Sequence, residues 1–387
     1  MTMEQVYTLL NNVTKEILGE TAIVAEDLSN VVDIGQAFED AAGLDNYVRS
    51  LVDHIGKVVF VDRIYNGRAP SVLMDGWEFG SILEKIRVVM PSASENASWQ
   101  LTDGQDYPTN IFHAPTVSAK FFNDRVTYEV KMSFTEKQVK SSFSSAMQLN
   151  GFMSMIYSAI NNSMTVKNDA LIMRTINAAI GETLHAEYPT ALYSASSGTR
   201  AVNLLWLYNQ KFSQTLTPAA AITDANFIRF ASFIIKNYMR RMQGMSKLFN
   251  IEGTEKFTPA DRMHVVMLDE FKNAAEVYLY DGLNQFNTEG IKLPASVETV
   301  DYWQGSGLSY AFADTSAINI TTPSEDEVTA SGILGVIFDR DALGVANIDR
   351  RVRSHYVESA EFWNEWHKAD AQYFLDLSEN IVVFFVA

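Results

Sequence analysis

The sequence predicts an α+β protein in which a helical arm, a projecting β-arm, a long helix, a mixed α/β region and a β-rich tail follow one another. Three patterns support this prediction. Residues 126–134 alternate apolar and polar side chains, which is typical of a half-buried strand. Residues 144–180 carry apolar side chains at four-residue steps, which indicates one long helix. Residues 374–386 contain the most β-prone side chains of the chain.

The composition is that of a globular protein with a large core. The chain has 387 residues, 47% of them hydrophobic, and this length predicts either two or three folded regions or one domain with long excursions. It has no cysteine, which excludes disulfides, thiolate nucleophiles and cysteine-bound zinc. The net charge of −17 argues against general affinity for nucleic acid, because phosphate contacts need lysine and arginine. Neither a secretory signal nor a segment long enough to cross a membrane is expected.

The first part of the chain predicts an arm followed by a ribbon. Residues 1–57 show the spacing of short helices and contain ten acidic and three basic residues. The β-arm that follows needs a neighbour to lie on, because it cannot bury both faces of its own ribbon. It contains a short β-like run at 58–61, a strand at 85–90, a polar, turn-rich stretch at 91–110, and alternating strands at 117–121 and 126–134.

The long helix is expected to end at Gly181, and a break near Asn161 and Asn162 stays open. Residues 201–330 predict a separate mixed α/β region. Its expected elements are a helix at 227–249, a strand at 265–267 that leads into a helix at 268–279, and short strands in the loop-rich stretch 281–330. In the tail, strands are expected at 332–338, 351–357 and 374–386.

One pair of residues imitates a metal site in its spacing. Glu182 and His185 form the E-x-x-H of di-iron centres, but the sequence has no second such pair. Asp261 and His264 are the nearest imitation, so a polar surface pair is favoured. The six histidines are scattered, and ordinary surface or core positions are expected for most of them.

A second segment imitates a calcium loop. Four of its residues match ligand or turn positions, namely Asp339, Asp341, Gly344 and Asn347. Leu343 and Arg350 stand where ligand oxygens are required, so a turn after the strand is favoured over a cation site. The sequence has no nucleophile elbow, Walker loop or H-E-x-x-H motif, and 305–307 is a very weak dinucleotide signal.

The helix expected at 227–249 carries a local excess of positive charge in an acidic chain. Its basic residues are Arg229, Lys236, Arg240, Arg241 and Lys247, with no acid between Asp224 and Glu252. Two interpretations stay open: contact with an acidic patch of a partner subunit, such as the N-terminal arm, or a solvated helix face. The methionine and phenylalanine stripe of this helix is expected in the core.

The order of these segments, over essentially the whole chain, resembles the major capsid protein of tailed phages, a fold also found in the floor of herpesvirus capsids. The most specific local string is GVIFDRDALG at 335–344, which is similar to a strand and F-D-R-x-A-L-G segment late in such proteins. The aromatic stretch EFWNEWH at 361–367 looks closer to the versions found in short-tailed phages.

The resemblance implies a division of the chain. It implies an N-terminal arm at 1–57, an extended loop (E-loop) at 58–140, a peripheral domain with the spine helix at 141–200, an axial domain at 201–330, and strands at 331–387 that return to the peripheral and axial body. The lysine, asparagine and glutamate of a cross-linking site cannot be placed, so no isopeptide bond is inferred. The short arm implies a separate scaffolding protein.

The resemblance also implies a function. The protein is expected to be a structural subunit, and not an enzyme, that assembles with copies of itself into hexamers and pentamers of an icosahedral or prolate shell around the phage genome. Scaffolding and portal proteins are the further partners, the location is the virion after assembly in the host cytoplasm, and no cofactor, metal or membrane is expected. Five residues are expected at contacts between subunits: Trp99, Tyr107, Tyr128, Arg240 and Arg241.

Two alternatives stay open from the sequence. The same fold could form an encapsulating cellular compartment, which would carry a groove for cargo peptides. A soluble α/β enzyme would instead assemble a pocket in three dimensions, lined by several of Glu182, His185, Asp261 and His264.

Overall fold

The computed structural model describes residues 63–74, 82–107, 110, 112–135, 146–279, 297–305 and 311–387. The expected arm at 1–57 and the β-like run at 58–61 lie outside these residues. The described chain forms two compact units. The first takes the residues up to Asn66, those from Glu129 to Met164, and Arg351–His367; the second takes Gly67–Tyr128, Thr165–Arg350 and Lys368–Ala387.

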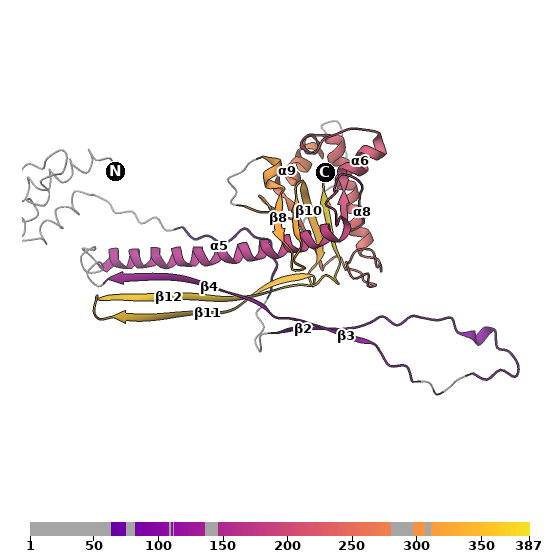
Figure 1. The fold of residues 1–387 in the computed structure, drawn as a ribbon, viewed down its shortest axis with the longest axis horizontal. Coiled ribbons are helices and arrows are strands. Elements are labelled where there is room, and N and C mark those ends of the chain that lie inside the picture. Colours follow the sequence, from indigo (N-terminus) through magenta and orange to yellow (C-terminus); the bar gives the residue numbers. More distant parts are fainter. Residues whose placement is uncertain are drawn as a thin grey trace, which may run out of the picture. The chain divides into compact units, whose positions relative to one another are not determined.

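The core of the second unit is a five-stranded sheet (Figure 1). Its strands, in spatial order, are β5 (Ala201–Asn203), β13 (Ile381–Phe385), β10 (Ile333–Asp339), β6 (Met263–Leu268) and β7 (Val297–Val300). β10 is antiparallel to both β13 and β6, whereas the two outer pairs are parallel. Every residue of β6, β10 and β13 is buried, which explains why these strands are continuous apolar runs without alternation.

Among the described residues, five helices beyond the long one belong to this unit. They are α6 (Leu204–Phe212), α7 (Pro218–Ala221), α8 (Ala225–Met242), α9 (Asp269–Leu279) and α10 (Phe312–Thr315). Side chains fix where two of them begin: Asn203 accepts a hydrogen bond from the Trp206 amide, and Asp224 accepts one from the Phe227 amide. The expected strand at 265–267 and helix at 268–279 are thereby confirmed as β6 and α9.

The helix expected at 227–249 is shorter than predicted. α8 ends at Met242, whose carbonyl accepts a hydrogen bond from the amide of Thr258 at 2.8 Å. Ser246 then pairs with Lys256 in an isolated antiparallel bridge. Phe249 is buried in irregular structure after the helix. Its apolar side chain fits the helical spacing in the sequence, and for this reason the predicted helix is too long.

The long helix is α5 (Ala146–Glu187), and it runs without interruption through both positions where the sequence suggested a stop. The helix does not break near Asn161 and Asn162. The Asn162 side chain binds the backbone of Arg63 and Tyr65 and does not compete for the backbone of its own helix. The end predicted at Gly181 is wrong. A Cβ there would lie 2.7 Å from the Ile320 side chain, so this glycine allows close packing within the helix.

A four-stranded sheet has the order β1-β11-β12-β4. Its strands are β1 (Leu73–Met74), β11 (Leu343–Val357), β12 (Phe362–Leu375) and β4 (Asp124–Thr135). The expected strands at 126–134 and 351–357 are confirmed within β4 and β11. The apolar tail at 374–386 is two strands instead of one, because residues 376–380 turn between β12 and β13.

Two further pairs of antiparallel strands complete the described fold. β2 (Leu83–Val88) pairs with β3 (Val117–Phe122), and the short 3-10 helix Ala97–Trp99 lies in the connection between them. β8 (Ile318–Thr321) pairs with β9 (Glu327–Ala330). The strands expected at 85–90 and 117–121 are therefore confirmed, and they are each other's partners.

Candidate functional site

The β2–β3 hairpin has an unusual distribution of polarity. One face of the ribbon is half-buried and carries three cations, Lys85, Arg87 and Lys120. The opposite face is exposed and mostly apolar: Ile86 is 65% exposed, Val88 61%, Val117 56% and Phe121 65%. A ribbon that lies on its own protein body normally places apolar side chains inward and charges outward. Here the three cations face inward beside Leu83 and Phe122, and apolar side chains dominate the exposed face, so the outward face is the candidate contact surface.

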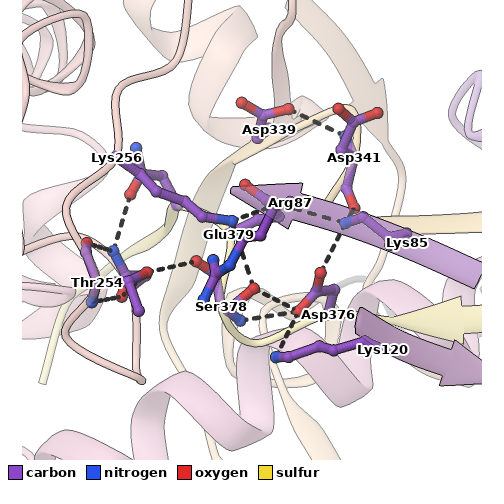
Figure 2. A network of polar contacts seen from close by, with 12 residues as sticks. Lys85, Arg87, Lys120, Thr254, Lys256, Asp339, Asp341, Asp376, Ser378 and Glu379 are labelled. Atoms are coloured by element: carbon purple, nitrogen blue, oxygen red, sulfur yellow. Dashed lines mark hydrogen bonds and ion pairs between the residues drawn. The ribbon is translucent and has the colours of Figure 1, made fainter. Parts of the chain in front are cut away.

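The inward cations would repel one another without a common partner. Lys85 and Lys120 are directly opposite each other across the two strands, an arrangement that is unfavourable for like charges. The carboxylate of Asp376 lies between them (Figure 2): Oδ2 is 2.6 Å from the Lys85 ammonium, and Oδ1 is 3.0 Å from that of Lys120. One carboxylate thus joins both strands to the turn between β12 and β13.

The Asp376 carboxylate is held in place by its own turn. Its side chain is 2% exposed, and its Oδ1 accepts hydrogen bonds from the amide and the hydroxyl of Ser378 at 3.1 and 2.7 Å. Burial alone would raise the pKa of the Asp376 carboxyl. The hydrogen bonds from Lys85, Ser378 and Lys120 outweigh this effect and hold the pKa well below its usual range. The carboxylate is therefore charged at neutral pH.

The Lys85 ammonium uses all three of its hydrogens. Besides Asp376, it donates to the carbonyl oxygen of Asp341 at 2.8 Å and to Oε1 of Glu379 at 3.3 Å. Its stem also places the charge 5.9 Å from the centre of the Phe374 ring. A fully satisfied ammonium at this depth indicates a specific anchor, since a loose surface ion pair would leave donors to water.

Three more ionic contacts surround the central carboxylate. Glu252 binds Lys120 and lies 3.9 Å from the Arg87 guanidinium, while Lys256 is 2.5 Å from Glu379 (Figure 2 shows the latter). Burial lowers the pKa of Lys256, and the Glu379 carboxylate opposes this shift. We call the set Lys85, Arg87, Lys120, Glu252, Lys256, Asp376 and Glu379 the ionic anchor.

The comparisons with known proteins identify the family. The family model described as Phi29-like phage major capsid protein matches residues 10–385, which is nearly the whole chain. The chain belongs to this family of phage major capsid proteins. No curated protein sequence matches it. The capsid protein has the fold seen in solved phage structures, and both the family and the fold are those of structural proteins.

Two solved structures illustrate the similarity. A chain from the capsid structure of Staphylococcus phage Andhra is 11% identical, with 86% of this chain and 87% of that chain covered and a TM-score of 0.53. A chain from the structure of the head fiber and inner core protein of native bacteriophage P68 is 9% identical, with the same coverage and a TM-score of 0.50. At these identities the likeness concerns the fold alone.

The capsid protein places the five expected contact residues in three regions. Trp99 is 96% exposed in the connection between β2 and β3, and Tyr107 in the same connection accepts a hydrogen bond from the Thr102 amide at 3.1 Å. Tyr128 is half-buried in β4, and burial raises the pKa of its hydroxyl. Arg240 and Arg241 are exposed in the last turn of α8.

The imitations of metal and enzyme sites have structural roles in the capsid protein. Glu182 accepts a hydrogen bond from the Ser324 amide at 2.9 Å, and His185 is 3.3 Å from Asp326. His264 lies 2.7 Å from Glu298 instead, so these candidate pocket residues have different partners. Among the described residues no group of three or more histidine, aspartate or glutamate side chains could hold a metal ion. None of the described helices is long and apolar enough to span a bilayer.

The segment that imitates a calcium loop is a turn, as expected. The Asp339 carboxylate accepts a hydrogen bond from the Asp341 amide at 3.0 Å, and Asp341 pairs with Arg262 at 2.5 Å. Burial raises the pKa of Asp339, although the Asp341 amide opposes the shift. This turn presents the Asp341 carbonyl to Lys85, so the F-D-R-D string contributes to the ionic anchor.

Sequence reasoning missed the ionic anchor. Lys85 and Lys120 stand at polar positions of alternating strands, where a solvated face is the ordinary interpretation. Their partner Asp376 is more than 250 residues away from each in the chain, and no local spacing connects them. Only the composition could have pointed to the ionic anchor. Two lysines stand among apolar neighbours in the hairpin, and an Asp-Leu-Ser-Glu segment interrupts the most apolar part of the tail.

Proposed function

We propose that this capsid protein builds a closed icosahedral or prolate shell from copies of itself, arranged as hexamers and pentamers, around the phage genome. The observation that supports the proposal is the distribution of polarity on the β2–β3 hairpin. Its inward cations form ion pairs within the same subunit, while its apolar face is exposed to solvent. Burying that face against a neighbouring copy provides the favourable free energy of association.

The proposal assigns a role to each segment. The hairpin and its connection act as the E-loop within 58–140, α5 acts as the spine of a peripheral domain at 141–200, and 201–330 form the axial domain with strands from the tail 331–387. Residues 1–57 act as an arm on a neighbouring copy. Because each contact repeats around the shell, many weak interfaces add up to a stable particle.

The protein acts as a structural subunit, and not as an enzyme, in this proposal. Scaffolding and portal proteins are its transient and permanent partners, and assembly takes place in the host cytoplasm before the virion is complete. The net charge of −17 supports a shell that encloses DNA without adhering to it. Purified subunits should therefore bind DNA weakly; tight binding that weakens steeply with salt would contradict this part of the proposal.

The direct test is deletion of residues 91–110. The eight residues left between the strands, 89–90 and 111–116, are enough to connect β2 to β3 while the ionic anchor stays intact. We expect a folded subunit with an unchanged far-ultraviolet circular dichroism spectrum that does not form closed particles in negative-stain images. Closed particles at the wild-type yield would contradict the role of the connection.

A point variant tests the hairpin face itself. Phe121→Asp places a charge on the outward surface, where the wild-type ring is 65% exposed and contributes little to the stability of the isolated subunit. The control is Glu84→Gln, because Glu84 is directly opposite Phe121 and is also exposed. We expect F121D to reduce particle yield strongly and E84Q to leave it near wild type, as measured by sedimentation.

A further inference from the structure

The exposed face of α8 is a basic surface with an aromatic centre. Arg229, Phe233, Lys236 and Arg240 follow one another at steps of four, three and four residues, which places them within about 60° of one another around the helix. The opposite stripe is buried in the core of the second unit. Phe233 stays 50% exposed at the centre of the basic face.

Two cations of this face, Lys236 and Arg240, have no acidic partner among the described residues. Neither Lys236 nor Arg240 forms an ion pair with any residue that the structure describes. Burial lowers the pKa of Lys236, and no carboxylate opposes that shift. Two uncompensated cations beside an exposed aromatic ring, on a chain with a net charge of −17, are the features of a surface that receives an acidic partner.

An acidic surface lies on the same unit. The turn between β8 and β9 carries three consecutive acids, Glu325, Asp326 and Glu327. Asp326 is 3.3 Å from His185, whereas Glu325 and Glu327 form no ion pair with a described residue. We call 324–327 the acidic turn.

The acidic turn has a defined conformation. The Thr322 amide donates to the Asp326 carbonyl at 2.9 Å, the Glu325 amide donates to the Thr322 carbonyl at 2.9 Å, and Glu182 binds the Ser324 amide. Glu325 has a φ of +66°, a conformation that costs about 1 kcal/mol for a residue with a side chain. A rigid turn loses little entropy on binding, so it suits an interface.

The two surfaces lie apart on the second unit. In the view of Figure 1, α8 and β8 are on either side of β10. Among the described residues, no ion pair joins Lys236 or Arg240 of a subunit to its own acidic turn. Complementary patches at separate places on one body are what a head-to-tail ring of identical subunits requires, because each copy offers one patch to each neighbour.

We propose that the basic face of α8 in one copy receives the acidic turn 324–327 of the next copy around a capsomer. This inference rests on the proposed function and names a residue-level contact within it. A second copy fits better than nucleic acid, because a net charge of −17 repels polyphosphate and an exposed phenylalanine is suited to a protein surface.

The test is a charge swap. The variant K236E/R240E reverses the basic face, E325K/E327K reverses the acidic turn, and the quadruple variant restores complementarity with opposite signs. We expect each double variant to lower the yield of sedimenting particles at least tenfold and the quadruple variant to return it to within about threefold of wild type. The losses should shrink at high salt, because exposed charges are screened.

A matched control separates local complementarity from net charge. The quadruple variant has the wild-type charge of −17, since −17 − 4 + 4 = −17. K236E/R240E combined with D261K/E358K has the same net charge, because two acids again become lysines. Asp261 and Glu358 are chosen because they are exposed acids outside the acidic turn. This control should not regain assembly. Circular dichroism and melting temperature identify any variant that fails to fold, and R240E alone then replaces the double reversal.

The outcomes are distinguishable from failure of the proposed function. If the wild-type chain forms no particles with or without a scaffolding partner, the proposed function fails. If the wild type assembles and either double reversal assembles equally well, only the charge-swap inference fails. If K236E/R240E alone abolishes assembly and the quadruple variant does not rescue it, the basic face binds a different partner, and the inference is again overturned.

Discussion

Replacing Asp376 by asparagine tests whether the ionic anchor holds the hairpin. The substitution removes the charge from a side chain that is 2% exposed and leaves Lys85 and Lys120 facing each other without it. Breaking a fully buried ion pair costs about 3–5 kcal/mol. The lysine side chains are 24% and 30% exposed, so water recovers part of that cost. Asparagine also keeps an acceptor for Ser378. We therefore expect D376N to lose about 2–3 kcal/mol of stability.

The assay for D376N has a global and a local readout. Urea unfolding of the unassembled subunit measures the change in free energy of unfolding. Hydrogen exchange of the amides in β2 and β3 measures opening of the hairpin, and a loss of 2–3 kcal/mol corresponds to about 30- to 150-fold faster exchange. The control is Glu255→Gln, which removes a carboxylate from the exposed pair with Lys247 and should cost less than about 0.5 kcal/mol.

The pH dependence has a definite sign. The pKa of Asp376 is lower in the folded protein than in the unfolded chain, so folding stabilises the carboxylate relative to the protonated acid. Its stabilisation is complete above the unfolded pKa of about 3.9 and is lost as the pH falls further. D376N should flatten that acid limb. A loss below 0.5 kcal/mol with unchanged hairpin exchange would refute the assignment of Asp376 as the anchor.

Two more outcomes follow from the structure. A methyl group at Gly332 would lie 2.0 Å from the Val386 carbonyl oxygen, at a φ of +81°, so G332A should lower the free energy of unfolding in urea by at least about 3 kcal/mol. The control G104A has a similar φ of +78° but no atom within 4 Å of its Cβ, and should lower it by only about 1 kcal/mol. Equal losses would contradict the argument. Because Trp99 is 96% exposed, the fluorescence difference between wild type and W99F should shift to shorter wavelength on assembly if Trp99 enters a subunit contact, and an unshifted difference spectrum excludes that contact.

Local patterns in the sequence predicted the elements that depend on local physics. The alternation in 117–121 and 126–134 and the four-residue steps of 144–180 reproduce β3, β4 and most of α5. Both periods follow from side-chain directions within one element. They hold regardless of what the element packs against, and so one sequence is sufficient to recognise them.

The wrong predictions have tertiary causes. Gly181 is a helix terminator by propensity, yet in α5 it makes room for Ile320 from a strand that follows it by more than a hundred residues. Phe249 extends a helical stripe but is buried in irregular structure after α8. The break between β12 and β13 depends on an Asp376–Ser378 turn whose stability derives partly from lysines of the hairpin. Such contacts are not encoded in any short window.

The ionic anchor also explains how an apolar ribbon can stay exposed without collapsing onto its own subunit. An apolar hairpin on a flexible tether would fold its hydrophobic face against the nearest apolar surface, whatever its orientation. A buried charge without a partner costs free energy, so each charge must meet its own counterion. The three inward cations of β2 and β3 therefore specify which face of the ribbon meets Asp376, Glu379 and Glu252. Turning the ribbon over would bury Ile86 and Phe121 but leave the Asp376 carboxylate buried without cations. The anchor therefore contributes orientation more than net stability, and that orientation keeps the apolar face available to a second copy.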